Sequence, residues 1–180
     1  MTSTTPPDRY AASLRWLHWS IFALVLLAYV FINLFELFPR GSATRGNVLA
    51  AHFLAGLAVL LLVLPRLAVR LGHVDPPVRP PLDRWMAVLS KVTHVALYLF
   101  LLVQPVLGLI TLQVGGKAIS LFGFTVLPPR FGAGDRALSH QWEDIHGTIG
   151  EVFYYVIGLH IAAALWHHFG RRDNTLRRML

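Results

Sequence analysis

The sequence predicts an all-α integral membrane protein: an antiparallel four-transmembrane-helix bundle, formed as a single membrane domain over residues 1–180. Three observations predict this fold. Apolar residues make up 55% of the chain and charged residues only 14%, a balance too apolar for a surface that faces water. Four mostly apolar runs each reach the length of about 20 residues that a transmembrane helix needs. Segments rich in proline and glycine separate these runs.

The elements are read in order along the chain. The predicted spans are residues 14–37, 47–71, 85–113 and 142–169. The first is too long for a cleaved signal peptide and has no small-residue cleavage site after it. Pro39 and Gly41 separate it from the second span, and four prolines separate the second from the third. A loop rich in glycine and proline, residues 114–141, precedes the fourth.

The distribution of charge predicts the orientation of the bundle. An even number of spans puts both termini on one side of the membrane. Eleven of the sixteen Lys and Arg residues lie on that side and five on the other, so the positive-inside rule places both termini in the cytoplasm. The formal charge of +7 therefore reports orientation, and the expected partner is lipid and not nucleic acid.

Histidine is the most informative residue type in this chain. The absence of cysteine excludes disulfides, thiolate zinc sites, iron–sulfur clusters and covalently attached haem. Of the nine histidines, His73 and His140 are assigned to loops and given no role. Ionisable groups inside a membrane span are costly, so each is a functional hypothesis. The histidines inside the predicted spans are His18, His52, His94, His146 and His160, with His167 and His168 at the cytoplasmic end of the fourth span.

These histidines sort into two layers. His146 and His160 are fourteen residues apart, which is close to four helical turns, so they share one helix face about 21 Å apart. Judged by distance from the flanking charges, His18 and His160 form an inner layer, and His52 and His146 form an outer layer. His94 has the depth of the inner layer and competes with His18 as the partner of His160. Depth alone does not choose between them.

Two imidazoles per layer predict two non-covalent b-type haems, because haem iron takes two axial ligands and its other four from the ring. Catalytic zinc would need three protein ligands, and neither the His-Glu-x-x-His motif nor its inverse is present. Small residues beside the histidines, such as Gly56 and Gly147, would let a flat ring approach the backbone. A single histidine in a span is more often a packing residue, and a histidine-lined metal or proton transporter is the rival of a different class.

Several motifs carry a resemblance to a known family. They are Arg9-Tyr10, Leu17-His18-Trp19, Phe38-Pro39-Arg40, the segment 47–52, Trp142, Gly158-Leu159-His160, His167-His168-Phe169 and the segment 173–176. With these motifs the chain resembles the bacterial cytochrome b561 family over nearly its whole length. The resemblance implies a dihaem cytochrome of the bacterial inner membrane. It implies that His18 and His160 bind the cytoplasmic-side haem, that His52 and His146 bind the outer haem, and that His94 has a secondary role. For that role the candidates are a hydrogen bond to a haem propionate or to a quinone oxygen.

The resemblance also implies an activity: oxidation of superoxide at the outer face with reduction of membrane ubiquinone. A membrane subunit that docks a separate dehydrogenase is the alternative within the same class. Attraction of superoxide requires a local positive field. The basic residues available on that side are Arg40, Arg45, Lys117, Arg130 and Arg136, although acidic residues make this side neutral in total.

The end of the fourth span supplies candidates for a quinone site. Trp166, His167 and His168 lie two turns beyond His160, and Arg171 follows. A titratable imidazole can hydrogen-bond a quinone carbonyl and relay protons. The alternative is an interfacial anchor with a positive flank. Glu151, one turn after His146, is either a proton-linked group near the outer haem or a residue that faces water.

Overall fold

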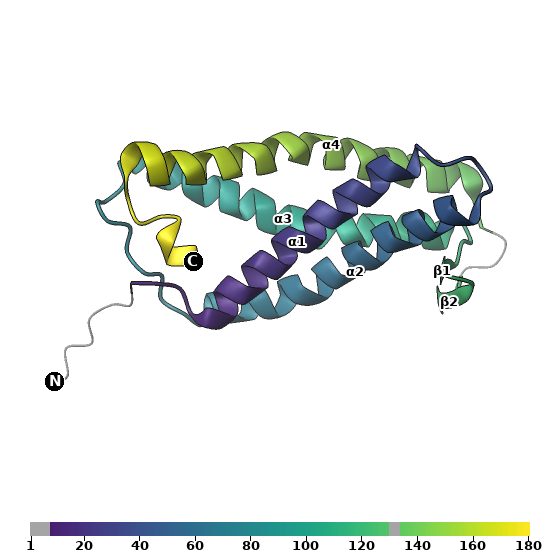
Figure 1. Ribbon diagram of the computed structural model, residues 1–180, viewed down its shortest axis with the longest axis horizontal. Helices are drawn as coiled ribbons and strands as arrows, with labels where there is room; N and C mark the ends of the chain where they lie inside the picture. The colour runs from purple at the N-terminus through teal and green to yellow at the C-terminus, as the bar shows by residue number, and fades with distance from the viewer. Residues whose placement is uncertain (1–7, 130–133) are drawn as a thin grey trace.

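The computed structural model describes residues 8–129 and 134–180 as four long helices and one short hairpin (Figure 1). The helices are α1 (Ala12–Phe35), α2 (Ala43–Leu71), α3 (Arg84–Val114) and α4 (Arg136–Trp166). All four are long and apolar enough to cross a membrane. A bilayer offers no water to backbone N–H and C=O groups, so a spanning segment must pair them internally, as a helix does. The chain is a multi-pass membrane protein.

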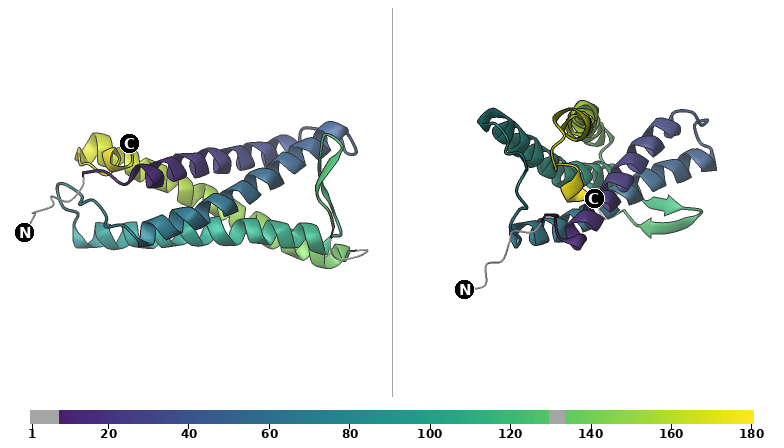
Figure 2. Two further views of the ribbon diagram at one scale, coloured as in Figure 1. Left: turned by 90° about the horizontal axis from the view of Figure 1, so that it is seen from below. Right: turned by 60° about the vertical axis from the view of Figure 1, so that its left-hand side comes forward.

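The helices form an antiparallel bundle, which confirms the predicted fold class. Helix α1 packs on α2, α2 on α3, and α3 on α4. Figure 2 shows that the helices run along one common long axis and cross at an angle instead of lying strictly parallel. The C-terminus and the start of α1 lie at one end of the bundle, which we call the terminal end (Figure 1). The short hairpin marks the other, which we call the hairpin end.

Capping residues extend the helices beyond some of the predicted spans. The Asp135 side chain accepts a hydrogen bond of 3.0 Å from the Leu138 N–H, and α4 therefore begins at Arg136, six residues before its predicted start. Ser42 caps α2 in the same way through Arg45. An apolar run marks the lipid-crossing part of a helix, whereas side-chain caps stabilise polar turns outside it. His140, assigned to a loop from sequence, is an exposed residue near the start of α4.

The segment assigned to an irregular loop, residues 114–141, contains a hairpin that the sequence reading missed. Strands β1 (Ile119–Leu121) and β2 (Phe124–Leu127) pair antiparallel, with Ile119 opposite Leu127. Strands of three and four residues are too short for an alternating pattern to stand out from a loop. Ile119 is buried against Ala50 and Leu112, so the hairpin is packed onto the ends of α2 and α3.

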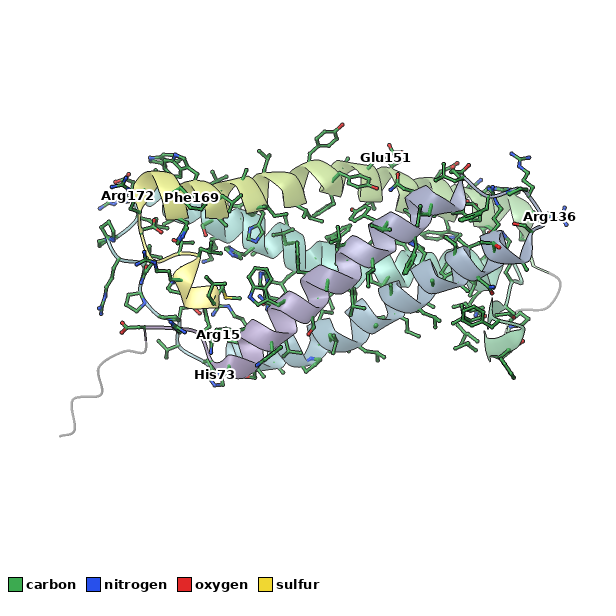
Figure 3. The ribbon with its side chains drawn as sticks, viewed as in Figure 1. Arg15, His73, Arg136, Glu151, Phe169 and Arg172 are labelled. Atoms are coloured by element: carbon green, nitrogen blue, oxygen red, sulfur yellow. The ribbon has the colours of Figure 1, made fainter. Side chains whose placement is uncertain are left out.

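The last residues of the chain fold back and close the terminal end. A π-helix, η1 (His167–Arg171), ends α4, and a 3₁₀-helix, η2 (Arg177–Met179), lies near the C-terminus. Met179 O accepts a hydrogen bond of 2.9 Å from the Trp19 indole. Figure 3 shows Arg15, His73 and Arg172 at this end and Arg136 at the other, as the division of charges from the sequence requires.

Candidate functional site

Two histidines face each other inside the hairpin half of the bundle. His52 comes from α2 and His146 from α4, and their ring centroids are 6.1 Å apart with planes at 89°. A bond from a metal to an imidazole nitrogen is about 2 Å long, which puts a ring centroid about 3 Å from the metal. The separation of the two rings therefore fits one metal ion held between them.

The hydrogen bonds of this pair fix which nitrogen of each ring is free. His52 Nδ1 lies 2.9 Å from the carbonyl oxygen of Ala28, and His146 Nδ1 lies 3.1 Å from that of Gln104. A carbonyl only accepts, so each Nδ1 carries the proton and donates. Both Nε2 atoms then keep their lone pairs, as in metal-bound histidines whose other nitrogen bonds the backbone.

A cavity of about 370 Å³ surrounds this pair. It is lined by residues of α1, α2, α3 and α4 and is largely apolar near the histidines. A Cβ added at Gly56 or at Gly147 would meet nothing within 4 Å, so the backbone there borders open space. At Gly108, in contrast, an added Cβ would lie 3.2 Å from Cε1 of His146. The glycines thus leave room in the cavity and room behind the His146 ring.

Three histidines gather nearer the terminal end. The His94 and His160 ring centroids are 5.6 Å apart, and His94 Nδ1 donates to Ser90 O at 2.6 Å. His18, on α1, lies within electrostatic range of both, and its ring has an edge contact with Trp19. The structure therefore brings His94 directly beside His160, a contact that depth along the sequence left undecided between His94 and His18.

These two levels are suited to a metal that brings part of its own ligand set. Fourteen residues of α4 separate His146 from His160, which is about 21 Å along the helix. Within residues 8–129 and 134–180, no group of three or more His, Cys, Asp or Glu side chains is placed to hold a metal ion. An ion bound by two imidazoles alone would lack ligands, whereas a macrocycle supplies four.

Buried polar atoms without partners gather at the terminal end. In the described part of the chain, the Nε atoms of Arg15 and Arg178, the Tyr98 hydroxyl and His168 Nδ1 are buried and make no hydrogen bond. Buried donors without acceptors are costly, and such atoms in a native protein call for a partner. Two arginines and a hydroxyl suit carboxylate groups.

A histidine and a carboxylate form an ion pair where α4 ends. His167 Nδ1 lies 2.5 Å from Oδ2 of Asp173, whose side chain is fully buried. The other carboxylate oxygen accepts from the Thr175 N–H at 2.9 Å, and Arg171 Nε is 3.4 Å from Oδ2. In the sequence, Asp173 belongs to the motif 173–176 but was given no role in the site. One feature of the sequence could have pointed to this role of Asp173: it is a single acidic residue among arginines, a few positions after the histidine pair His167 and His168.

Burial alone would raise the pKa of Asp173, but the hydrogen bonds from His167 and Thr175 outweigh it, so this pKa lies below its usual value. A carboxylate with a lowered folded-state pKa stabilises the fold fully above its unfolded-state pKa. The stabilisation is lost as the pH falls through the lower folded value. Asp173 is therefore charged throughout the neutral range.

The remaining quinone-site candidates divide between the interior and the surface. Arg171 also contacts Asp83 at 3.7 Å and donates to Pro81 O. Trp166 is half exposed, and its ring meets the edge of His167. His168 is partly buried and has an edge contact with Phe169. The structure thus groups Trp166, His167 and Arg171.

The basic residues of the hairpin end differ in how freely they meet solvent. Arg45 is held inward by Glu36 at 3.6 Å, by the Phe38 carbonyl and by the Phe35 ring. Lys117 is exposed, and Arg136 projects from the start of α4 (Figure 3). Arg40 is exposed between α1 and α2, and Arg130 lies outside the described residues. Glu151 is exposed at the edge of the cavity.

A family model described as prokaryotic cytochrome b561 matches residues 9–180. The chain belongs to this family. Cytochrome b561 homolog 1 of Escherichia coli K12 is 32% identical over 173 residues, which is 96% of this chain and 97% of the relative. The probable superoxide oxidase CybB of Yersinia pestis is 31% identical over 164 residues, 91% of each chain. Cytochrome b562 of Cereibacter sphaeroides is 31% identical over 91% of this chain and 90% of its own.

As a member of the prokaryotic cytochrome b561 family, the chain is an electron-transfer protein of a membrane, and the family implies b-type haem. The residues of this cytochrome fit such a group. At the hairpin end, His52 and His146 line a cavity bordered by open glycines, and the Nε2 lone pair of each ring is free because its Nδ1 bonds a backbone carbonyl. At the terminal end, His94 lies within electrostatic range of Arg178, whose unpaired Nε, like that of Arg15, suits a propionate carboxylate.

Proposed function

We propose that the chain is a dihaem b-type cytochrome that carries electrons across the bacterial inner membrane from superoxide to ubiquinone. One observation carries this proposal. The ring centroids of His52 and His146 are 6.1 Å apart, and both residues line one cavity. A second level of histidines about 21 Å along α4 supports a second haem. Haem iron, when bound, supplies one-electron transfer at each level.

In this proposal His52 and His146 hold the haem of the hairpin end, and His18 and His160 hold that of the terminal end. The assignment of His18 rests on the family resemblance and on its position near His160. His94 then borders the terminal-end haem. Because its Nδ1 proton is engaged by Ser90 O, neutral His94 accepts hydrogen bonds at Nε2, and it donates to a propionate only when protonated.

The terminal end faces the cytoplasm in this proposal, since most of the basic residues lie there. Each superoxide loses one electron and becomes oxygen at the hairpin end. Two such electrons and two protons convert one quinone to a quinol at the terminal end. Among the described residues, Arg40, Lys117 and Arg136 are the exposed cations of this end that can attract superoxide, whereas Arg45 is occupied by Glu36 and Phe38.

The proposed quinone site is built from Trp166, His167, His168 and Arg171. His167 bonds a quinone carbonyl through Nε2, while its Nδ1 is held by the buried carboxylate of Asp173. Asp173 is thus a positioning residue: it fixes the ring of His167, which passes a proton to the quinone. Trp166 is half exposed and borders the lipid from which the quinone enters.

The direct test of this function is a superoxide-driven quinone assay on the purified chain in detergent. We expect quinol to form at one molecule per two superoxide molecules consumed, and to stop when superoxide dismutase is added. If the purified cytochrome is inert and a co-purifying dehydrogenase restores turnover, the chain is a docking subunit and the oxidase proposal is wrong.

Asp173→Asn tests the proton-handling half of the site. We expect the reoxidation of reduced haem by quinone to slow by about 10-fold or more, because His167 loses the charge that holds it. Reduction of haem by superoxide should keep its rate, since the hairpin end is unchanged. Stopped-flow absorbance separates the two steps.

The matched control for that variant is Asp83→Asn. Both carboxylates contact Arg171, but only Asp173 contacts His167. Equal slowing in both variants, or slowing of both half-reactions in Asp173→Asn, would indicate a structural role for Asp173 and would contradict its assignment as a positioning residue.

A further inference from the structure

The hairpin exposes large apolar side chains while it also buries others. Ile119 is only 2% exposed and packs on the helix ends with Ala50 and Leu112. Phe122 and Phe124, which flank Gly123 at the turn, are 75% and 78% exposed. We call Phe122, Gly123 and Phe124 the hairpin tip. Packing therefore explains how the base of the hairpin is anchored, whereas the two phenyl rings of the tip are largely uncovered by the described residues.

The backbone conformation of the tip is one that bulky residues rarely adopt. Phe122 has φ +50° and Gly123 has φ +86°, as in the two-residue turns that normally prefer Asn-Gly. A bulky residue with positive φ is strained and is retained only where something compensates. The Asn47 side chain accepts from the Phe122 N–H at 2.9 Å and holds the turn against α2. Nothing within the described chain uses the Phe122 ring itself.

The tip is bonded to α2 where its apolar run begins, since Asn47 is the first residue of the predicted span 47–71. Asn47 lies in the first turns of α2, five residues before His52, so the tip is about 7.5 Å nearer the hairpin end than that histidine. Figure 2 shows the hairpin extending to the side of the bundle, across its long axis, instead of beyond the helix ends. The tip thus lies beside the lipid-facing helix surfaces.

The charge pattern is that of an interfacial segment. No acidic, basic or histidine residue occurs between Lys117 and Arg130. Basic side chains at both ends of an apolar segment can extend to lipid headgroups. Aromatic residues are favoured at the boundary between lipid and water, where water and headgroups also satisfy the open backbone edge of a short hairpin.

We propose that the hairpin tip inserts into the interfacial layer of the bilayer at the hairpin end. The occupant of this surface is lipid because the tip continues the exposed apolar surface of the helices at its own height. Phe122 and Phe124 pack among acyl chains just below the headgroups. The tip holds the hairpin flat across the ends of α2 and α3, so that its base stays closed over the hairpin-end core.

The absence of cysteine allows a clean test by site-directed spin labelling. The whole chain is reconstituted in lipid nanodiscs with a nitroxide on Phe122→Cys or, separately, on Phe124→Cys. Electron paramagnetic resonance then compares collisions with oxygen, which enters lipid, and with a water-soluble nickel chelate. The second position keeps the test valid if a cysteine at 122 alters the turn. Exposed Arg40→Cys at the same end is the aqueous control, and lipid-facing Leu27→Cys in α1 is the membrane control.

We expect the oxygen-to-nickel ratio at both tip positions to exceed that of Arg40→Cys and to approach that of Leu27→Cys. A ratio equal to that of Arg40→Cys at both positions would place the tip in water and overturn the proposal. Protection from both reagents, or dipolar broadening from a second label, would mean that another protein chain or a second copy covers the tip, and would overturn it as well.

Discussion

His52→Ala and His146→Ala are each expected to lower the haem content from two haems per chain to one. Each substitution removes one of the two imidazoles that face each other at 6.1 Å, so the hairpin-end haem loses an axial bond and its hold in the cavity. The terminal-end level is about 21 Å away along α4 and keeps its haem. Pyridine haemochrome absorbance, divided by protein concentration, measures the effect.

His140→Ala is the matched control for this pair. It lies on the same helix as His146, near the helix start, but it is exposed, and its Nδ1 lies 3.4 Å from a carboxylate oxygen of Glu143. We expect it to retain both haems. Loss of both haems in His52→Ala with unchanged helical content would mean that the two levels are not independent. Retention of both would mean that His52 is not a ligand.

The terminal end gives the second large effect. His160→Ala and His18→Ala are expected to lose one haem each, and His94→Ala is expected to keep two. In His94→Ala the proposed ligands His18 and His160 are both still present, and only the hydrogen bond from His94 Nδ1 to Ser90 O is lost. A shift of the reduced-haem absorbance or potential without haem loss is therefore the signature of His94. The reduced-minus-oxidised spectrum identifies which haem remains.

These variants distinguish the two possible partners of His160. In the described residues the ring contact of His160 is with His94, whereas the proposed haem ligand is His18. The tautomer of His94 also leaves Nε2 free, as in a ligand. If His94→Ala loses the terminal-end haem and His18→Ala keeps it, then His94 is the axial partner of His160. The assignment carried over from the family is wrong in that case.

The sequence predicted the bundle well because lipid imposes a simple rule on it. A helix that crosses a bilayer needs a long apolar run, and such runs are visible without tertiary information. Helix α4 begins before the predicted span 142–169 because Asp135 caps a polar turn that no hydropathy pattern marks. The hairpin was missed because its strands are short and its stability comes from Ile119 packing on α2 and α3.

The site was predictable only where one helix sets the geometry. His146 and His160 share a face of α4, and helical periodicity alone gives their alignment and spacing. The choice between His18 and His94 depends on how α1 and α3 cross α4, which residue counting does not describe. Asp173 reaches His167 because the chain reverses after a π-helix and a left-handed Arg172. Such a reversal leaves no periodic signal in the sequence.

The haem content and absorbance spectrum of the purified wild-type chain are the most direct measurement. Two b-type haems per chain are expected, both low-spin with two imidazole ligands, because each of the two levels offers a pair of histidines. A preparation that is folded by circular dichroism but has no Soret band would contradict haem binding altogether. One haem per chain would contradict the second level.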